Sequence, residues 1–380
     1  MNILALECYY GGSHKAFLDG WIPRSRHHWT VLSLPAHKWK WRMRHGAITL
    51  ADRTAELLDQ GHRPDLLLTS DMLNLAEYLG LAPRRLRDIP TVVYFHENQL
   101  TYPVQHQDER DFHYVLNNIT TAMAASAVWF NTAYHRDAFL AALPAFFNKM
   151  PDYRPTFAID RIAAKAVVAP PGIDPIPPRP RRAPGPLRIC WAARWEHDKN
   201  PETFFDAVGR LRARGVDFRL DVLGEQFRRN PPIFDRARES LAGHIDRWGY
   251  QPRRADYLAA LHQADVFVST AHHEFFGLSA VEAIAAGAWP LLPNRLSYPE
   301  ILAGVPRAAD HLHDGSAADL AERLAVLARR LDQAGTLWPD DPAAAAGAMT
   351  AFAWPALQPR YDDALDRLAR VSKNSTTPGL

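Results

Sequence analysis

Four consecutive side chains able to form hydrogen bonds follow an apolar segment in the N-terminal half of the chain. The segment 91–95 (TVVYF) is rich in β-branched and aromatic residues, which predicts a buried strand. It is followed directly by His96, Glu97, Asn98 and Gln99. A surface loop needs polarity, but Ser, Gly and Asp would supply it. This choice of side chains therefore indicates a loop with a chemical role, and the rest of the chain must show which one. The alternative for His96 is a structural histidine that caps the strand end.

A pair of cations lies at a second predicted strand end. Arg194 and Lys199 follow the apolar run 187–193 and precede a helix predicted from Pro201. Cations beside a helix N-terminus form an anion site, because fixed charges and free backbone N–H groups meet there. The alternative is a solvated basic loop.

Two glutamates flank a third predicted strand-end loop. Glu274 and Glu282 are separated by seven residues, with Gly277 and Leu278 between them. Gly277 permits close approach of a ligand to the backbone, and the N–H groups near it and Leu278 are suited to a phosphate. A carboxylate at Glu282 could accept both hydroxyls of a ribose. The alternative is a pair of surface glutamates.

These loops must be positioned by two α/β domains, because short apolar runs alternate with amphipathic stretches in both halves. This alternation of strand and helix patterns predicts two Rossmann-like domains with doubly wound parallel sheets. The ligands of such sheets bind beyond the carboxyl ends of the strands. The expected parts are an N-terminal domain (1–170), a Pro-rich linker (171–186), a C-terminal domain (187–341), helices packing back towards the N-terminal domain (342–371) and a disordered tail (372–380).

Composition narrows the class of protein. The 380 residues carry a formal net charge of +2, which argues against a dedicated high-charge nucleic-acid binder but allows local basic patches. The only cysteines, Cys8 and Cys190, end apolar runs and favour buried thiols in a reducing compartment. The start reads as a strand and not a signal peptide, and no apolar run has the length of a membrane helix. We therefore expect a cytoplasmic protein without a membrane partner.

The order Arg, Lys, Glu, seven residues, Glu resembles the nucleotide-sugar half of retaining glycosyltransferases of family four, which have the two-Rossmann GT-B architecture. The resemblance implies that Arg194 and Lys199 bind the diphosphate, that Glu274 contacts the sugar and that Glu282 binds the ribose. Gly277 and Leu278 would complete the donor site.

Two positions depart from the family pattern. The family usually has glycine before the arginine and after the first glutamate, where this chain has Ala193 and Phe275. These departures indicate a subgroup with its own pocket shape on the sugar side.

Four motifs occur in one order along the chain: YYGGSHK, FHENQLTYP, WEHDKNP and HHEFFG. Together they resemble the tRNA-queuosine α-mannosyltransferase family. The resemblance implies a GT-B fold with two domains facing across a cleft, and transfer of mannose from GDP-mannose to the cyclopentene diol of queuosine in a tRNA anticodon. It implies retention of configuration, no cofactor besides the donor and no metal. The residues agree with the last point, because the sequence has no Asp-x-Asp motif and no Cys/His cluster with zinc spacing.

The resemblance also assigns residues to the reaction. The catalytic group would be His96, Glu274, Arg194 and Lys199, with His96 facing the donor sugar. Gly11 and Gly12, after the first strand, would let their loop approach the diphosphate. The acceptor-binding residues would include Ser13, His14, Glu97, Asn98 and Gln99.

A basic, tryptophan-containing segment, residues 36–46, is a candidate tRNA contact. Cations suit phosphates and aromatic rings suit stacking on the unpaired bases of an anticodon loop. The alternative is an amphipathic segment that packs its tryptophans on the domain. The candidate residues are Lys38, Trp39, Lys40, Trp41, Arg42 and Arg44.

Other functions fit parts of the pattern. A family-four enzyme acting on a glycolipid or polysaccharide would need a membrane-docking helix in the first half. A non-catalytic nucleotide-sugar-binding protein would not need the sugar-side Glu274. An epimerase shares the architecture but has no need of a tRNA surface. The residues leave open GDP or UDP, mannose or another hexose, the tRNA and the oligomeric state.

Overall fold

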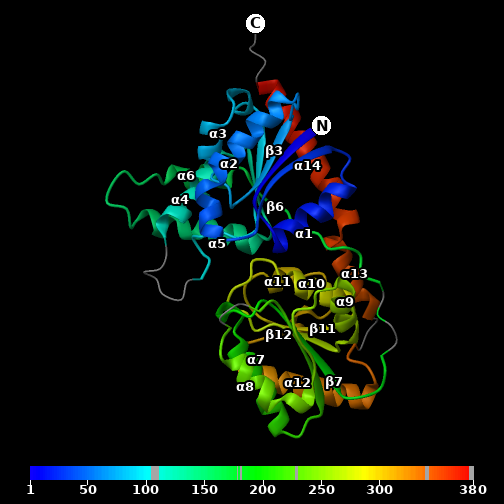
Figure 1. Ribbon diagram of the computed structural model, residues 1–380. Coiled ribbons are helices and arrows are strands. Elements are labelled where there is room, and N and C mark those ends of the chain that lie inside the picture. The colour runs from blue at the N-terminus through cyan, green and yellow to red at the C-terminus, as the bar shows by residue number, and fades with distance from the viewer. Residues whose placement is uncertain (104–110, 178, 180–181, 227–229, 339–341, 376–380) are drawn as a thin grey trace. The chain divides into compact units, whose positions relative to one another are not determined.

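The computed structural model describes residues 1–380 except 104–110, 178, 180–181, 227–229, 339–341 and 376–380, and it gives no side-chain environment for residue 342 or for 372–375. The chain forms two compact units (Figure 1). Unit 1 comprises Met1–Asp174 and Trp354–Leu380, and unit 2 comprises Pro175–Ala353.

Each unit is built on one parallel sheet of six strands, in the order β2-β1-β3-β4-β5-β6 in unit 1 and β12-β11-β10-β7-β8-β9 in unit 2. The strands of unit 1 are β1 (Asn2–Tyr10), β2 (His28–Pro35), β3 (Leu66–Ser70), β4 (Thr91–Phe95), β5 (Ala127–Phe130) and β6 (Ala166–Val168). Those of unit 2 are β7 (Leu187–Ala192), β8 (Phe218–Leu223), β9 (Ile245–Gly249), β10 (Val266–Val268), β11 (Trp289–Pro293) and β12 (Leu312–His313).

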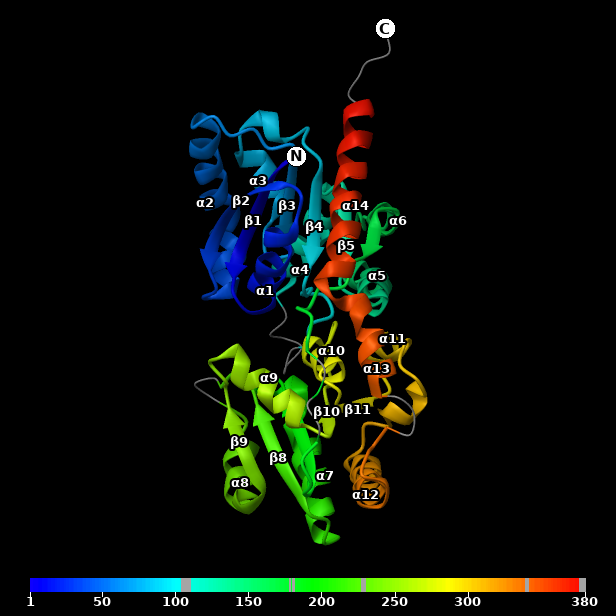
Figure 2. The same cartoon turned by 90° about the vertical axis from the view of Figure 1, so that its right-hand side faces the viewer.

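Helices connect the strands and cover the sheets (Figures 1 and 2). Those of unit 1 are α1 (Gly12–Trp21), α2 (Trp39–Asp59), α3 (Leu75–Leu81), α4 (Phe112–Ala124), α5 (Ala133–Phe147), α6 (Phe157–Ala163) and α14 (Trp354–Ser375). Those of unit 2 are α7 (Pro201–Ala213), α8 (Ile233–Ser240), α9 (Arg254–Gln263), α10 (Leu278–Ala285), α11 (Tyr298–Leu302), α12 (Ala317–Ala334) and α13 (Pro342–Ala348).

The central strands are apolar along their whole length because both faces of the sheet are covered. All five residues of β3, β4 and β11 are buried. One core of unit 1 lies on the α2–α3–α4 side of its sheet, and the other is built around Phe17, Trp21 and Trp354. The two-domain α/β class read from the sequence is thus confirmed, and so is the parallel character of both sheets.

The last helix returns to the first unit. In α14, Asp362 is fully buried and accepts hydrogen bonds from Trp21 Nε1 at 2.9 Å and from the backbone N–H of Arg26 at 2.8 Å. A side chain at Gly172 would overlap the ring of Trp354, so glycine there lets the ring lie against the backbone. The preceding helix α13 belongs to unit 2, and α14 continues to Ser375. The prediction of disorder from residue 372 was therefore wrong for 372–375, and 376–380 lie outside the described residues.

Candidate active site

His96 is held at the end of β4 through its backbone. Its N–H donates to Asp71 Oδ1 at 2.9 Å, and its carbonyl accepts from Asn131 Nδ2 at 3.0 Å. Its half-buried ring lies against the imidazole of His14, with ring centroids 4.0 Å apart, and against Tyr94 at 4.6 Å. Burial, followed by the charge of His14, holds the pKa of His96 well below its ordinary value. His96 is therefore a neutral hydrogen-bonding group at neutral pH.

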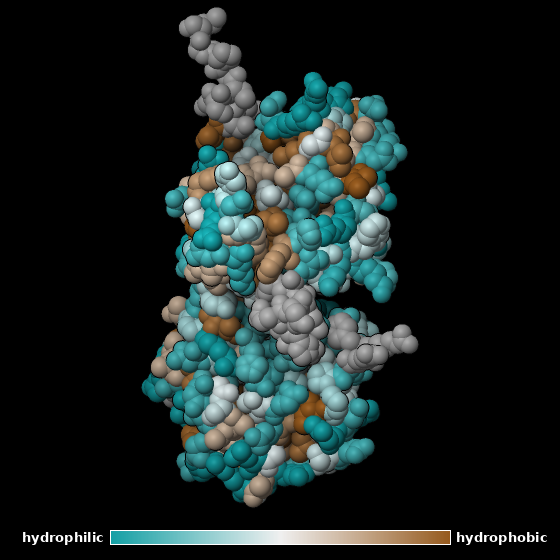
Figure 3. Space-filling model, turned by 90° about the vertical axis from the view of Figure 1, so that its left-hand side faces the viewer, coloured by the Kyte–Doolittle hydropathy of each residue, from teal (hydrophilic) through white to brown (hydrophobic). Residues whose placement is uncertain are grey.

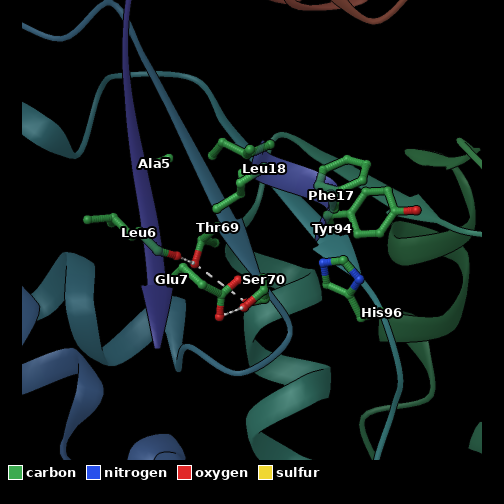
Figure 4. Close-up of a pocket in the computed structure, with 10 residues that line it drawn as sticks. Ala5, Leu6, Glu7, Phe17, Leu18, Thr69, Ser70, Tyr94 and His96 are labelled. Carbon is green, nitrogen blue, oxygen red and sulfur yellow. Dashed lines mark hydrogen bonds between the residues drawn. The ribbon is translucent and has the colours of Figure 1, made fainter. Parts of the chain in front are cut away.

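Glu7 and His14 form an ion pair beside this ring, and sequence reasoning gave Glu7 no role. Glu7 Oε2 lies 3.2 Å from His14 Nδ1. Oε1 of the same carboxylate accepts from Ser70 Oγ at 2.9 Å, as Figure 4 shows, and from the N–H of Tyr9 at 2.8 Å. Burial alone would lower the pKa of His14, but the Glu7 carboxylate raises it to about 9. His14 is thus a buried cation, and the one visible signal in the sequence was a carboxylate inside the apolar run NILALEC.

Asp71 completes this cluster from the end of β3. Its side chain is fully buried, and burial raises its pKa to about 8, against the opposing effect of His14. Oδ1 accepts from the backbone of His96, whereas Oδ2 has no hydrogen-bond partner among the described residues. Asp71 is therefore largely protonated at neutral pH, and it fixes the backbone that presents His96. Parallel pairing of β1 with β3 and of β3 with β4 brings Glu7, Asp71 and His96 together.

The side chain of Asn98 forms hydrogen bonds that stabilise the loop after β4. Its side chain is fully buried, with Nδ2 2.9 Å from His135 Nε2 and Oδ1 accepting from the N–H of Thr101 at 2.8 Å. These contacts shape the turn after β4, so the position of Asn98 does not favour the acceptor-binding role predicted for it. The environments of Glu97 and Gln99 differ from that of Asn98, because neither side chain is fully buried. Gln99 Nε2 donates to Glu97 Oε1 at 3.1 Å, and Gln99 is half-buried, which leaves this pair at the edge of the loop.

Glycine is favoured at the two positions after β1 for two different physical reasons. A side chain at Gly11 would meet the Cβ of Ala36 at 2.3 Å, so the loop requires the smallest residue there. Gly12 has φ of 52°, in the left-handed region that glycine adopts readily, and a Cβ added there would meet no atom of the described residues within 4 Å. Gly12 and Ser13 are exposed at the N-terminus of α1, where backbone N–H groups are free to meet an anion.

In unit 2, Lys199 is the centre of a buried cation–carboxylate group. Its Nζ donates to the carbonyl of His273 at 2.8 Å, and it lies 3.0 Å from Asp198 Oδ2 and 3.5 Å from Glu274 Oε2. Burial alone would lower the pKa of Lys199, but Glu274 and Asp198 together raise it. The ammonium is thus charged and fixed, and it joins two of the residues predicted to be catalytic.

The loops after β7 and β10 are tied together by backbone contacts. β7 and β10 are neighbours in the sheet, and Thr270 Oγ1 donates to the carbonyl of Lys199 at 3.0 Å. The N–H groups of His272 and His273 both donate to the carbonyl of Asp198, at 2.8 and 3.2 Å. Lys199 and Glu274 therefore keep their separation without help from a ligand.

Arg194 has a different environment from Lys199. Its side chain is 45% exposed and lies 3.3 Å from Glu196 Oε2. It lies on the loop that Asn200 ends, where the Asn200 side chain caps α7 by accepting from the N–H of Thr203. The helix predicted from Pro201 begins there as expected, so Arg194 and Lys199 both lie on the loop that leads into its N-terminus.

Glu282 lies in α10 with two partners that sequence reasoning missed. One oxygen pairs with Arg254 and the other accepts from the hydroxyl of Tyr257 at 3.0 Å. The carboxylate is still able to accept further hydrogen bonds, because each oxygen has two acceptor positions. At the start of the same helix, Gly277 has φ of 103°, and a side chain there would meet Tyr298 at 3.2 Å. Leu278 is the first residue of α10.

The basic segment forms the first turns of α2, with Lys38 as N-cap in a left-handed conformation. Trp39 packs on the core beside Tyr114, at a centroid distance of 5.2 Å, whereas Trp41 is 60% exposed and lies against His45. Arg42 donates to the carbonyl of Pro35 at 2.9 Å and contacts His45. The members of the segment therefore differ in their contacts, and the side chains of Trp39 and Arg42 contact other residues of unit 1. The exposed members are Lys38, Lys40, Trp41 and Arg44.

Two groups within the described residues have the composition of a metal site. Glu7, His14 and His96 offer ligand atoms that all lie within 4.8 Å of one another, and so do His313, Asp314 and Asp319. In the first group, Glu7 already has hydrogen bonds from Ser70, Tyr9 and His14. In the part of the chain that the structure describes, no helix has the length and apolar character needed to cross a membrane.

Comparison with known proteins agrees with both the fold and the motifs. The model of the tRNA-queuosine alpha-mannosyltransferase N-terminal family matches residues 2–173, and that of glycosyl transferases group 1 matches residues 173–328. Among solved structures, sucrose-phosphate synthase from Thermosynechococcus elongatus aligns with a TM-score of 0.71 at 14% identity, covering 98% of this chain and 100% of that one. The trehalose-phosphate synthase of Burkholderia xenovorans aligns with a TM-score of 0.61 at 16% identity, covering 98% and 99%.

Fold and motifs together define a glycosyltransferase of the GT-B type. A Drosophila melanogaster tRNA-queuosine alpha-mannosyltransferase is 36% identical over 312 residues, which cover 79% of this chain and 81% of the relative. The chain therefore belongs to the tRNA-queuosine alpha-mannosyltransferase family. A GDP-mannose-dependent phosphatidylinositol dimannoside mannosyltransferase of Mycobacterium tuberculosis is 29% identical over 63% of this chain and 60% of its own length.

Proposed function

We propose that this enzyme transfers mannose from GDP-mannose to the cyclopentene diol of queuosine in a tRNA anticodon, with retention at the anomeric carbon. The observation that carries the proposal is the 36% identity, across both units, to a relative that is named a tRNA-queuosine alpha-mannosyltransferase. The choice of GDP-mannose has additional support, because the name of the mycobacterial relative also specifies that donor.

Donor activation falls to unit 2 in this proposal. Lys199 is charged and fixed, and Arg194 is a second cation on the same loop. Together with the backbone N–H groups at Gly277 and Leu278, they would stabilise the negative charge that develops on the leaving diphosphate. Such preorganised charges contribute more than charges that must reorient during the reaction. Glu274, held by Lys199, would bind sugar hydroxyls, and Glu282 would bind the ribose.

In the covalent step, all bonds and protons are exchanged between the donor and the acceptor. The C1–O bond to the diphosphate breaks, and an acceptor hydroxyl oxygen forms the new C1–O bond on the same face of the sugar. The hydroxyl proton passes to the departing diphosphate, so that GDP and the mannosylated tRNA are the products. No metal, and no cofactor other than the nucleotide sugar, takes part in this scheme.

His96 would act as a neutral hydrogen-bond partner of the sugar. Its lowered pKa keeps the ring uncharged, and its backbone is fixed by Asp71 and Asn131. A buried neutral site of this kind discriminates against sugars that lack the matching hydroxyl, because its polar groups would be left unpaired. Ser13, His14, Glu97 and Gln99 would lie on the acceptor side.

If the acceptor is queuosine in tRNA, the macromolecular partner is a tRNA and the enzyme works where tRNA is modified. Exposed cations and Trp41 at the start of α2 suit the phosphates and unpaired bases of an anticodon loop. Both cysteines are free and buried, which agrees with a reducing compartment where tRNA is modified. We therefore propose a cytoplasmic enzyme that binds queuosine-containing tRNA.

A second candidate is a lipid acceptor, which the mycobacterial relative and the exposed Trp41 favour. One experiment separates the two. The enzyme is incubated with GDP-mannose or with UDP-sugars, each in the presence of queuosine-containing tRNA, the same tRNA with guanine at that position, or phosphatidylinositol vesicles. The proposal expects transfer from GDP-mannose to the queuosine-containing tRNA alone. Transfer to vesicles, or to the guanine-containing tRNA, would contradict it.

A further inference from the structure

A group of exposed aromatic and cationic residues lies on unit 1 away from the start of α2. The most exposed is Tyr153, in the loop between α5 and α6, with a relative exposure of 96%. Phe157 at the start of α6 is 55% exposed, and Phe112 at the start of α4 is 38% exposed. Figure 1 shows this loop projecting from the body of unit 1, and Figure 3 shows the same side, where hydrophobic groups lie among hydrophilic ones.

Cations accompany these rings. The ammonium of Lys149 lies 5.5 Å from the ring centroid of Phe112, and the guanidinium of Arg161 lies 4.8 Å from that of Phe157. Arg154 follows Tyr153 directly, and it is exposed although its side chain donates to the carbonyl of Met150. We call the six residues the α5–α6 patch: Phe112, Lys149, Tyr153, Arg154, Phe157 and Arg161.

The backbone of Tyr153 gives an independent reason to attach a function to the patch. Its φ is 44°, a conformation that costs a bulky L-residue free energy. A strained residue that buries its ring is explained by packing. Tyr153 instead exposes almost the whole ring, so packing within unit 1 gives it no compensation. Strained residues of this kind concentrate at ligand-binding sites.

Contacts between side chains connect the patch to the start of α2. The guanidinium of Arg44 lies 4.9 Å from the ring centroid of Tyr114, in α4, and 4.0 Å from Asp111 Oδ2. Asp111 is the N-cap of α4 and immediately precedes Phe112, whose ring packs on Phe146 at 5.5 Å. One continuous surface therefore runs from the tRNA contact proposed at α2, past the start of α4, to the end of α5.

We propose that the α5–α6 patch is a second RNA-binding surface, which holds the tRNA away from the nucleoside that is modified. Exposed rings beside cations fit single-stranded RNA, because bases stack on the rings while the cations meet the phosphates. A protein partner is the weaker fit, since three of the six residues are cations and Asp152 is the only acid in the fully described loop 148–156. The inference rests on the proposed function, of which it specifies how the tRNA is held.

The test compares three variants of the full chain. The first is Tyr153→Ala with Lys149→Ala and Arg154→Ala. The second, Lys149→Gln with Arg154→Gln, changes charge and leaves the tyrosine in place. The control is Tyr250→Ala, because Tyr250 is 64% exposed on unit 2. Affinity for queuosine-containing tRNA is measured by fluorescence anisotropy over a range of salt concentrations, and transfer is measured with the tRNA and with free queuosine as acceptors.

The triple variant is expected to bind tRNA at least about tenfold more weakly, because one stacked base alone contributes on the order of tenfold. The charge variant should weaken binding less and reduce the salt dependence by about two units of slope, one for each lost phosphate contact. Transfer to free queuosine should be unchanged in both variants, and the control should behave as wild type.

Wild-type affinity of the triple variant for tRNA would overturn the inference, and so would equal loss of transfer with tRNA and with free queuosine. Failure of wild-type enzyme to bind tRNA would overturn it as well. The proposed function is tested separately. An enzyme that binds tRNA through the patch but transfers no mannose to it would contradict the proposed reaction and leave the patch established.

Discussion

Lys199 and Glu274 approach to 3.5 Å at the ends of two neighbouring strands of unit 2, and their loops are fixed to each other through backbone hydrogen bonds. The ammonium is largely buried and has the Asp198 carboxylate at 3.0 Å on the other side. Removal of Lys199 would leave two carboxylates without their cation. Removal of the exposed Arg194 would leave a single carboxylate, Glu196, without its cation, and that side chain is 31% exposed.

This difference predicts that Lys199→Ala and Arg194→Ala both reduce activity but differ in how much stability they lose. Lys199→Ala should lower stability by roughly 3–5 kcal/mol, the usual cost of leaving a buried charge unpaired. Arg194→Ala should change stability by less than about 1 kcal/mol. Both should reduce kcat/KM for transfer by at least roughly tenfold, because in the proposed scheme each removes a cation that binds the diphosphate. Urea denaturation and transfer kinetics check the prediction, and equal stability losses would contradict it.

Glu282→Ala is expected to weaken donor binding more than it slows the reaction of bound donor. The carboxylate is fixed by Arg254 and Tyr257, and we propose that it also accepts the ribose hydroxyls. Loss of a charge-assisted hydrogen bond costs about 1.5 to 3 kcal/mol, or roughly ten- to a hundredfold in affinity. Calorimetric titration with GDP-mannose and GDP checks this. An unchanged donor Kd would remove Glu282 from the ribose site, and Tyr257→Phe serves as a milder control.

The cluster around His96 predicts how stability depends on pH. The folded-state pKa of His14 is about 9, above its ordinary value of 6.5, so its contribution is fully present below 6.5 and is lost as pH rises through 9. Asp71, with its pKa raised to about 8 from 3.8, acts in the same direction, but its part of the decline begins above pH 3.8 and is complete near pH 8. Both groups therefore lower stability between about pH 6.5 and 8, and His14 continues to lower it up to about pH 9.

Glu7→Gln tests which group is responsible. The variant keeps the side-chain size but removes the carboxylate that raises the pKa of His14. The His14 part of the decline, on the order of 3 kcal/mol, should disappear from the pH dependence. Chemical denaturation at several pH values from about 6 to 9.5 gives the result. An unchanged slope in Glu7→Gln would show that the pair does not control the titration.

The site shows what a sequence can and cannot reveal. His96 and Lys199 could be proposed from the sequence because each follows the point where an apolar strand gives way to polar residues. Glu7 and Asp71 were missed as parts of the same cluster, because their meeting with His96 depends on the strand order β1-β3-β4, which no local pattern specifies. The environment of Asn98 could not be predicted from the sequence for a related reason. Its type suits a ligand, but its buried contact with His135 depends on the packing of α5.

Transfer activity should survive exhaustive treatment with EDTA. In the proposed scheme Lys199 and Arg194 supply the positive charge for the diphosphate, and Glu7 already accepts hydrogen bonds from Ser70, Tyr9 and His14. The measurement is transfer before and after treatment with EDTA, with and without added Mn²⁺ or Mg²⁺. Loss of activity that either ion restores would contradict the proposed scheme, and the Glu7, His14 and His96 group would then be the first metal site to test.

The last prediction concerns the start of α2, where the structure distinguishes cations that the sequence made equivalent. Lys38, Lys40 and Arg44 are exposed, whereas Arg42 bonds to Pro35 and His45 within unit 1. Replacing the three exposed cations by Ala should raise the KM for tRNA and leave the Kd of GDP-mannose unchanged. It should also lower the salt dependence of tRNA binding by about one unit of slope for each lost phosphate contact.

Arg42→Ala is the matched control for this prediction, because it removes the same type of charge from the same turn of helix. It should lower the Tm, since the carbonyl of Pro35 loses its donor, and it should leave the salt dependence of tRNA binding nearly as in wild type. Free queuosine as acceptor completes the comparison. Impairment of the triple variant with tRNA alone supports phosphate contacts, and equal impairment with both acceptors would mean that the segment supports the fold of unit 1 instead.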